Sequence, residues 1–400
     1  MHIPAGDFGL QDRALRADGR GAGFYTVSAA ALTGSFDIIS PQGDSIGGIV
    51  MHTLAIIGFG GMGSWHARNI MERVPEIRVK GAYDIREEAL NKAREMGLRA
   101  YGSLQELLDD AEVDLVTIAT PNNFHRPLAI QALRAGKNVI SEKPVTLNAR
   151  ELEEIIAVRD ETGKLFSVHQ NRRWDKDYCI IKKVLSEGTI GTPYFIESRV
   201  QGSRGAMHGW RGYKVNGGGM LLDWGVHLLD QLMNMIDAPV VSVDAHLLSL
   251  FTPGVDDNIK ILIRFGNGVS ALMEMATNCF VNHPRWHVCA SDGTCVVDDW
   301  SCNGRIVKLN TDKQMEWADD IVYTEAGPTR TMAPRPKQTT QELPLPEVDT
   351  DWSSYYKNIA AVLDGREELI VRPEQALRVM KVIDLMFKSE ELKHGLECCI

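Results

Sequence analysis

The chain has 400 residues, of which 44% are apolar and 24% charged, as expected for a globular protein with room for two domains. Its formal charge of -10, with no clustered stripe of Lys and Arg, disfavours a nucleic-acid partner, because a phosphate backbone would be repelled. No run of about 18 apolar residues is present, so we expect no membrane-spanning helix and no membrane partner.

Residues 1–50 are rich in Gly, Ala, Ser and Arg and lack apolar periodicity, and a second methionine, Met51, follows them. We expect an appended, poorly ordered extension. Residues 36–50 are interrupted by Gly, Asp, Ser and Pro, which argues against a signal peptide. A functional arm is the alternative, and loss of folding or activity on truncation to Met51 would support it.

The seven cysteines form no Cys-x-x-Cys pair, which favours reduced thiols and a cytoplasmic location. Cys289, Cys295 and Cys302 lie near His287 in the sequence, and such residues could together form a zinc site. Their spacing fits no short-loop ligand pattern, so we expect buried strand cysteines and no metal site.

Short apolar strands alternate with helical segments from Thr53 to about residue 171. The strand segments are LAIIGF, VKGAYD, DLVTIA, NVISEK and KLFSVH, and the intervening helices are expected at 64–73, 86–96, 126–135 and 149–162. This alternation predicts right-handed crossovers and a doubly wound parallel sheet of the α/β class, a Rossmann domain over residues 51–171.

The pattern changes in residues 172–400, where consecutive strands are joined by short turns such as Gly266-Asn267-Gly268 and Asp292-Gly293. Helices are expected at 176–187 and 221–236, and strands at 193–203, 240–250, 258–265, 269–277, 286–291, 294–299 and 304–309. Residues 326–347 carry five prolines and are expected to form an extended loop before closing helices at 351–364 and 373–393. We predict an α+β domain with a large, open, mostly antiparallel sheet.

The segment LAIIGFGGMGSWHARNI places a glycine fingerprint between the first strand and the first helix. Gly58 permits a tight turn, Gly60 lets the backbone approach a pyrophosphate, and Gly63 lets the helix pack closely on the strand. With Gly61 and Met62, these residues put helix N-terminal amides beside the phosphates of a dinucleotide. A purely structural turn is the competing interpretation.

Asp84 ends the second strand 21 residues after Gly63, where a carboxylate would accept hydrogen bonds from ribose hydroxyls. This favours NAD over NADP, because a 2′-phosphate would meet a negative charge. Arg86 follows closely and could turn toward a phosphate, which leaves NADP as the less favoured alternative.

Two more segments end strands at the carboxyl edge of the sheet, where doubly wound folds bind ligands. The first, ATPNNFH, makes Thr120, Pro121, Asn122 and His125 candidate neighbours of the cofactor, although a plain turn with a surface histidine competes for His125. The second, NVISEKP, brings Glu142 and Lys143 to the same edge, beside the nicotinamide and the substrate.

A third constellation lies in GGGMLLDWGVHLLDQL, where Asp223 and His227 are four residues apart and so share one face of a helix. Oxidation of an alcohol requires removal of the hydroxyl proton, for which a histidine is suited, and the Lys143 ammonium would stabilise the developing alkoxide. Each residue also has an ordinary explanation, as a strand end, a helix cap or a core histidine.

Together the motifs GFGGMG, ATPNNFH, SEKP, HQNRRWD (169–175) and GGGMLLDWGVHLLD resemble those of the Gfo/Idh/MocA oxidoreductase family, in order and spacing, from Met51 to near the C-terminus. The resemblance implies that Lys143 is the catalytic lysine, His227 the acid/base and Asp223 a substrate-binding companion. It also implies, less directly, that Arg172, Trp210 and Arg211 line the crevice for cofactor and substrate.

The same resemblance implies an NAD-dependent dehydrogenase that oxidises a secondary hydroxyl of a sugar, inositol or glycoside, and a homo-oligomer, a dimer or tetramer, formed through the open sheet. A redox-neutral enzyme that retains NAD and cleaves or epimerises a glycoside is the first alternative. A ligand-sensing protein without catalysis is the second, and the presence of Lys143, Asp223 and His227 together argues against it.

Overall fold

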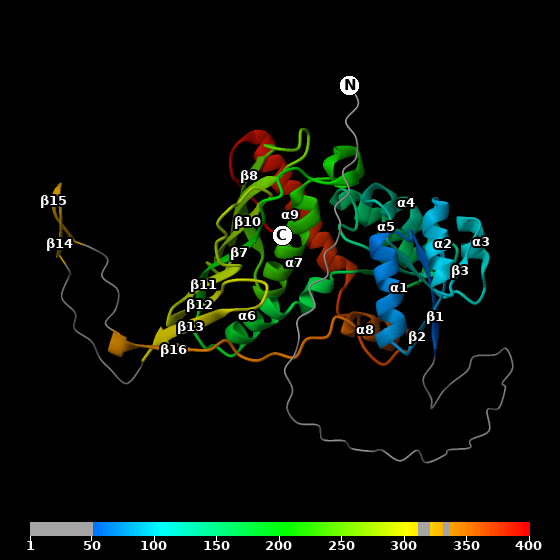
Figure 1. Cartoon of the computed structure of the whole chain (residues 1–400), viewed down its shortest axis with the longest axis horizontal. Coiled ribbons are helices and arrows are strands. Elements are labelled where there is room, and N and C mark those ends of the chain that lie inside the picture. Colours follow the sequence, from blue (N-terminus) through cyan, green and yellow to red (C-terminus); the bar gives the residue numbers. More distant parts are fainter. Residues whose placement is uncertain (1–50, 311–320, 331–336) are drawn as a thin grey trace, which may run out of the picture. The chain divides into compact units, whose positions relative to one another are not determined.

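The computed structural model describes residues 51–310, 321–330 and 337–400. The predicted extension, residues 1–50, lies outside the described residues. The described residues belong to one compact unit, which contains a six-stranded sheet, a nine-stranded sheet and the two-stranded β14-β15 sheet, with helices between and around the two larger sheets (Figure 1). Within the described part, none of the helices combines the length and apolar character needed to cross a bilayer.

The first sheet has six parallel strands in the order β3-β2-β1-β4-β5-β6, which confirms the predicted Rossmann-like topology. Its strands are β1 (His52–Ile57), β2 (Ile77–Tyr83), β3 (Arg99–Ala100), β4 (Leu115–Ile118), β5 (Asn138–Ser141) and β6 (Phe166–Val168). The helices of this layer are α1 (Gly61–Arg73), α2 (Glu87–Glu95), α3 (Leu104–Asp109), η1 (Asn122–Phe124), α4 (His125–Arg134) and α5 (Ala149–Thr162). The sequence analysis missed β3 and α3, which are only two and six residues long.

Continuous apolar runs explain why this sheet forms. All six residues of β1 and all four of β4 are buried, as expected for strands covered by helices on both faces. The helix boundaries also follow local rules. Asn148 caps α5 by accepting a hydrogen bond from the Glu151 amide, and Gly163 ends the helix in the left-handed conformation (φ 63°).

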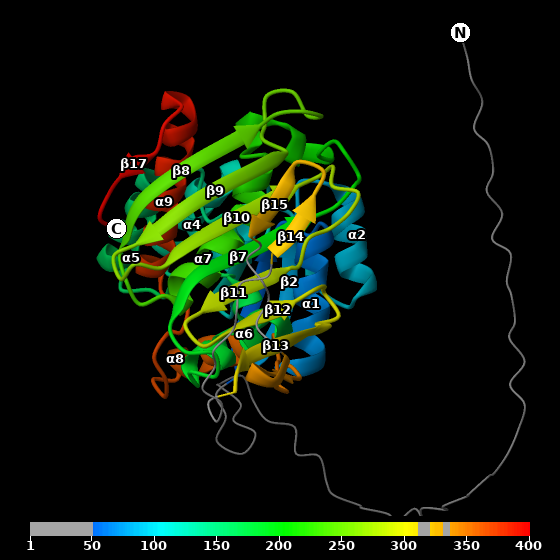
Figure 2. The same ribbon diagram turned by 90° about the vertical axis from the view of Figure 1, so that its left-hand side faces the viewer.

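The second sheet has nine strands in the order β16-β13-β12-β11-β7-β10-β9-β8-β17 (Figure 2). They are β7 (Pro193–Gln201), β8 (Val240–Leu248), β9 (Asn258–Phe265), β10 (Ser270–Ala276), β11 (Trp286–Ala290), β12 (Gly293–Val297), β13 (Gly304–Leu309), β16 (Thr340–Leu343) and β17 (Leu396–Glu397). Only β7 and β10 pair in parallel, and the other neighbours are antiparallel, as predicted.

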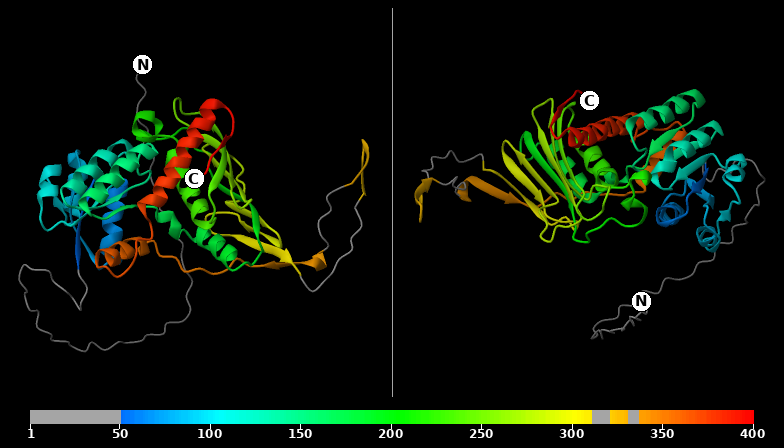
Figure 3. Two further views of the ribbon diagram at one scale, coloured as in Figure 1. Left: turned by 180° about the vertical axis from the view of Figure 1, so that it is seen from behind. Right: turned by 90° about the horizontal axis from the view of Figure 1, so that it is seen from above.

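Helices cover one face of this sheet, and in β9 every second residue is buried while the residues between them are exposed, which is typical of a sheet with one covered face. The covering helices are α6 (Lys176–Ser186), α7 (Val226–Met235) and α9 (Pro373–Leu392), which contact β12, β10 and β8 respectively (Figure 3). Short helical turns connect these elements: η2 (Asn171–Trp174), η3 (Gly209–Gly212), η4 (Lys214–Asn216), η5 (Leu221–Gly225) and η6 (Lys337–Thr339).

Helix α8 (Ser354–Leu363) belongs to a segment that the sequence analysis assigned to the second domain, yet it packs on the first sheet. The Tyr355 hydroxyl donates to Ser167 Oγ (3.0 Å), and the Tyr356 hydroxyl lies 2.6 Å from His66 Nδ1. The chain therefore returns to the Rossmann layer before α9 covers the second sheet.

The prediction of a loop over residues 326–347 was wrong in two places. Residues Gly327–Arg330 form β15, which pairs with β14 (Ile321–Thr324), and Thr340–Leu343 form the edge strand β16 against β13. Pro344 and Pro346 follow β16, whereas Pro328 lies within β15, and an edge strand tolerates a proline because half of its backbone groups are unpaired in any case.

The cysteine prediction also needs a correction. Cys295 is buried in β12 and Cys289 is half-buried in β11, as expected for strand residues. Cys302 instead lies in the turn between β12 and β13, partly exposed, with a left-handed backbone (φ 59°). The alternation of the flanking strands concealed this turn, because no glycine or proline marks it at residue 302.

Candidate active site

The turn between β1 and α1 has the shape that a pyrophosphate needs. Gly58 has φ 91°, and a Cβ at Gly63 would lie 2.0 Å from the Gly58 carbonyl oxygen, so both positions require glycine. A Cβ at Gly61 would meet nothing within 4 Å, so the space in front of the turn is open. The first helical hydrogen bond of α1 runs from Ser64 N to Gly60 O, which leaves the earlier amides, including that of the partly exposed Met62, available to an anion.

Asp84 organises the same turn from the end of β2. Its Oδ2 accepts a hydrogen bond from Phe59 N (2.8 Å), and its Oδ1 accepts from the backbone (2.9 Å) and Nε (3.2 Å) of Arg86. The carboxylate is buried while the Arg86 side chain is 60% exposed. The carboxylate therefore lies where a ribose would be recognised, and Arg86 is tied beside it.

The segment after β4 has a bridging role that the sequence did not predict. Asn122 Nδ2 donates to Gly217 O (2.8 Å), and so links the Rossmann layer to the glycine-rich lead-in of the second layer. His125 is fully buried, with Nδ1 2.8 Å from Pro144 O and Nε2 2.9 Å from Thr120 O. Both histidine nitrogens thus face carbonyl oxygens of the chain, and the cofactor role of His125 stays a prediction.

Thr120 is the residue of this segment that best fits a cofactor contact. Its Oγ1 is buried and has no hydrogen-bond partner among the described residues. A buried hydroxyl without a partner costs free energy, which a ligand group bound beside it would recover. Pro121, next to Thr120, is half-buried and shapes the turn without offering a donor.

Lys143 and Asp223 come together across 80 positions of sequence. Lys143 Nζ donates to the Asp223 carbonyl oxygen (2.9 Å) and to its Oδ1 (3.0 Å), and Arg211 Nε lies 3.2 Å from the same Oδ1. Burial alone would raise the pKa of Asp223, but the Lys143 and Arg211 cations outweigh it and lower the pKa below its ordinary value. Asp223 is therefore an anion held between two cations.

His227 lies on the same helical segment as Asp223, in a buried position. The segment begins as a π-helix, η5, and continues as α7, so the predicted single α-helix needs this correction. Burial, with further contributions from the Lys143 and Arg172 cations, holds the pKa of His227 well below its ordinary value. The neutral ring donates from Nδ1 to Gln170 Oε1 (3.1 Å), which leaves the lone pair on Nε2.

Arg172 and Trp210, which the resemblance placed near the crevice, occupy different positions. The Arg172 guanidinium donates to Asp175 Oδ2 (2.7 Å). Its Cζ lies 4.2 Å from the ring centroid of Trp224, the residue that follows Asp223 in the sequence. Trp210 lies beneath Arg211, whose guanidinium carbon is 4.5 Å from the indole centroid. Trp210 therefore supports Arg211, and Arg211 in turn contacts Asp223.

Glu142 is directed away from the crevice into a buried network that the sequence analysis missed. Its Oε1 lies 2.8 Å from His66 Nε2 and 3.0 Å from His169 Nδ1, and its Oε2 accepts from Lys143 N (3.0 Å). Burial raises the pKa of Glu142, but the two histidines outweigh it and the pKa is well below its ordinary value. Glu142 thus contacts the Lys143 backbone from within this network, and the cofactor contact expected of it stays a prediction.

The groups of His66, Glu142 and His169 are also close enough to one another to hold a metal ion, with ligand atoms within 4.8 Å. Each histidine already makes a hydrogen bond to Glu142, and Tyr356 engages the other nitrogen of His66. The network therefore explains these short distances without a metal.

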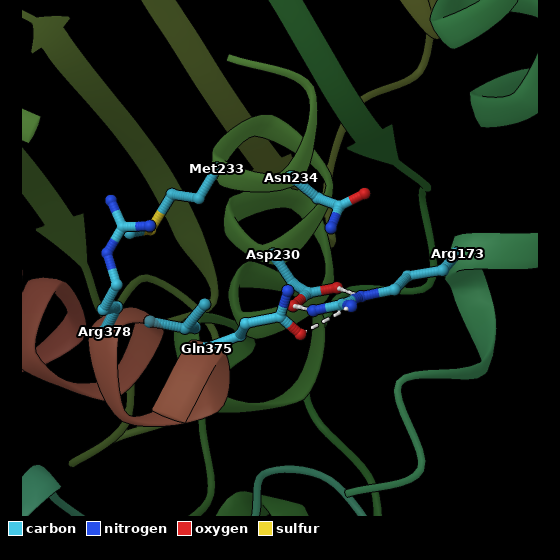
Figure 4. Close-up of a pocket in the computed structure, with 7 residues that line it drawn as sticks. Arg173, Asp230, Met233, Asn234, Gln375 and Arg378 are labelled. Atoms are coloured by element: carbon cyan, nitrogen blue, oxygen red, sulfur yellow. Dashed lines mark hydrogen bonds and ion pairs between the residues drawn. The ribbon is translucent and has the colours of Figure 1, made fainter. Parts of the chain in front are cut away.

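A second buried ion pair anchors the elements that carry the site (Figure 4). Arg173 on η2 donates to both oxygens of Asp230 on α7 (2.7 and 2.6 Å) and to Gln375 Oε1 on α9 (3.0 Å). The cavity beside them has a volume of only about 40 Å³, enough for little more than water. The Arg173–Asp230 ion pair holds α7, which carries His227, against the segment that carries Gln170.

The comparisons with known proteins agree with this arrangement. Residues 52–170 match the oxidoreductase family with an NAD-binding Rossmann fold, and residues 178–296 match the GFO/IDH/MocA C-terminal domain. A crystal structure of an NAD-binding protein from Listeria innocua is 40% identical, covers 87% of this chain and 99% of its own, and has a TM-score of 0.82. The chain belongs to the GFO/IDH/MocA family.

Curated relatives in this family include enzymes named for either nicotinamide cofactor. The scyllo-inositol 2-dehydrogenase (NADP(+)) of Bacillus subtilis is 25% identical over 85% of this chain and 94% of its own length. The scyllo-inositol 2-dehydrogenase (NAD(+)) of the same organism is 31% identical over 42% of this chain and 49% of its own. As a GFO/IDH/MocA oxidoreductase, this chain has an NAD-binding domain, and the open glycine turn and the unpaired Thr120 hydroxyl fit that cofactor.

Proposed function

We propose that this GFO/IDH/MocA oxidoreductase oxidises a secondary hydroxyl of a sugar, inositol or glycoside to a ketone, reversibly and with NAD as the preferred cofactor. The observation that carries the proposal is the Lys143–Asp223 contact of 3.0 Å at the carboxyl edge of the Rossmann sheet, with His227 on the same helical segment as Asp223. The inositol dehydrogenases among the relatives support a polyol substrate.

The three side chains supply what such an oxidation requires. The nicotinamide, when bound, accepts a hydride from the carbon that carries the hydroxyl. His227 is neutral and can accept the hydroxyl proton on Nε2, since Gln170 holds Nδ1 as the donor. The Lys143 ammonium stabilises the negative charge that develops on the oxygen, and Asp223 holds that ammonium in place.

Asp223 has a further role in this proposal. A carboxylate oxygen has more than one lone pair, so Asp223 can keep its contact with Lys143 and still accept a hydrogen bond from a neighbouring hydroxyl of the substrate. Sugars and inositols carry such adjacent hydroxyls, whereas simple secondary alcohols do not. We therefore expect a preference for polyols over isolated alcohols, in a cytoplasmic enzyme whose open sheet forms a dimer or tetramer.

The proposal is tested by a panel of inositols, monosaccharides and glycosides, assayed by nicotinamide absorbance with NAD and NADP side by side. We expect turnover of at least one polyol, and Lys143→Met should lower kcat by about a thousandfold because the oxyanion loses its cation. Binding of NADH, followed by protein fluorescence, should change little. Lys388→Met, which removes an exposed lysine on α9, is the matched control.

Two results would contradict the proposal. Full turnover by Lys143→Met would remove Lys143 from the chemistry. Absence of NADH accumulation across the panel, together with release of free sugar from a glycoside without added cofactor, would instead support the redox-neutral alternative.

A further inference from the structure

A cavity of about 520 Å³ lies beside Asp223 in the second layer, at the ends of strands β7 and β10. These strands form the one parallel pair of the nine-stranded sheet in the described structure, so their carboxyl ends open at the same place. Val200, Gln201, Ala276 and Thr277 line the cavity from these strand ends. Its volume is within the range of small-molecule sites.

The side chains that line this cavity carry an excess of positive charge. Arg204, His208 and Arg211 are basic, whereas Asp223 is the one acidic residue of the lining. Asp223 is already neutralised by Lys143 and Arg211. The whole chain has a formal charge of -10, so this local excess runs against the average of the molecule.

Arg204 has no hydrogen-bond or ion-pair partner among the described residues, and neither does His208, although both line the cavity. Two acids of the neighbouring loop accept hydrogen bonds from backbone amides. Asp256 accepts from Leu221 N (2.7 Å), and Asp257 accepts from three amides of residues 250–252. Arg204 is exposed where it lines the cavity, so its guanidinium is free to bind a group that the chain itself does not provide.

A second unpaired group belongs to the same cavity. Thr277 Oγ1 is buried and has no hydrogen-bond partner in the part of the chain that the structure describes. Thr277 follows β10, while Arg204 belongs to the loop that follows β7, so the two groups come from the two parallel strands. The Arg204 guanidinium offers N–H donors in one plane, and the Thr277 hydroxyl offers another donor. Donors of this kind bind the oxygens of an anionic group such as a carboxylate or a phosphate.

We propose that this cavity binds an anionic substituent of the substrate, a carboxylate or a phosphate, with Arg204 as its principal ligand. The proposal rests on the proposed function, because it takes Lys143 and Asp223 to hold the ring that is oxidised. It narrows the substrate class to acidic sugars or polyols: uronic acids, aldonic acids or phosphate esters. Arg211 contacts Asp223 and lines the cavity, and so connects the two parts of the site.

The experiment compares matched substrates: one neutral sugar or inositol, its carboxylate form and its phosphate ester. For the wild type, we expect kcat/KM for at least one anionic member to exceed that for the neutral member by tenfold or more. Arg204→Gln should bring this ratio close to one, with activity on the neutral member unchanged within about twofold. Arg305→Gln, which removes an exposed arginine on β13, is the control and should leave the ratio unchanged.

Calorimetric binding of the same ligands to the NADH-bound enzyme supplies a readout without turnover. Preference for the phosphate ester or for the carboxylate identifies the anion, and either one supports the proposal when Arg204→Gln abolishes it. Equal binding and turnover of neutral and anionic members would overturn the inference while leaving the proposed function intact. If no member turns over, the proposed function fails, and the calorimetric preference still decides whether the cavity binds anions.

Discussion

The glycine turn after β1 and the Lys143–Asp223 pair are two parts of one site that are assembled in different ways. The turn runs from Gly58 to Gly63, and its shape follows from the conformations of consecutive residues. Lys143 and Asp223 are 80 residues apart, and Asp223 reaches Lys143 only because the second layer packs against the first. The cofactor end is thus local in sequence, and the chemical end is tertiary.

This difference predicts how each end fails. A substitution in the turn should act through the backbone and abolish binding of the dinucleotide whatever the substrate. A substitution in the tertiary part should change rates, pH dependence or specificity while the cofactor still binds. The predictions below test this separation, starting with the largest expected effect.

Gly63→Ala should disrupt the cofactor end of the site. The added Cβ would lie 2.0 Å from the Gly58 carbonyl oxygen, so α1 must move away from β1. We expect at least about a 100-fold weaker binding of NADH and a loss of roughly 1–3 kcal/mol in the free energy of unfolding, as for other overpacked positions. Fluorescence titration and thermal unfolding measure these two effects.

Gly395→Ala, next to β17 in the second layer, is the matched control, because a Cβ there would make only ordinary contacts at 3.4 Å and beyond. It should bind NADH nearly as the wild type does. If both variants bound equally well, the close packing of α1 on β1 would not be what shapes the phosphate site.

Asp84→Asn should change which dinucleotide is preferred. The amide can still accept from Phe59 N, but it no longer repels a 2′-phosphate and no longer pairs with Arg86 as an anion. We expect the ratio of kcat/KM for NADP to that for NAD to rise about tenfold, which corresponds to about 1.4 kcal/mol.

The double variant that adds Arg86→Gln separates the two causes. If the released Arg86 binds the phosphate, the double variant should lose most of the gain with NADP. A single variant that weakens both cofactors equally would show that Asp84 supports the turn without discriminating between them.

Arg172→Gln tests the electrostatics of the tertiary end. The Arg172 cation contributes to lowering the pKa of His227, so its removal favours the imidazolium and raises that pKa. Catalysis requires neutral His227, and the acidic limb of the kcat/KM profile should therefore lie below pH 6.5 in the wild type and move to higher pH in the variant.

The control for this prediction is Arg150→Gln, since that side chain is 89% exposed on α5. Its pH profile should coincide with that of the wild type. An acidic limb that moved to lower pH in Arg172→Gln would contradict the assignment of His227 as the group that titrates.

The sequence predicted most of the fold because both sheets leave strong periodic patterns. The buried runs of β1 and β4 and the alternation of β9 identify a parallel and an open sheet without any tertiary information. Short or edge elements were missed, such as β3 and β16, because pairing with a neighbour stabilises them more than their own residues do. The π-helix η5, which directly precedes α7, has no sequence pattern of its own either.

The residues that lie within the motifs were predictable, but most of the contacts that hold them in place were not. Lys143 and Asp223 were expected in one crevice, and they are in contact. The partner of His227, Gln170, was inside the quoted motif HQNRRWD, but nothing in that motif indicates which side chain it meets. Tyr356 reaches His66 from 290 positions away, a contact that no local pattern can indicate.

The Glu142 carboxylate has a mechanical consequence. It joins His66 on α1, the helix that begins at the glycine turn, to the peptide nitrogen of Lys143. A displacement of that helix by a ligand at its N-terminus would therefore act on the backbone of Lys143 through two hydrogen bonds of a buried carboxylate. We therefore expect occupancy of the glycine turn and the position of Lys143 to be coupled through this buried carboxylate.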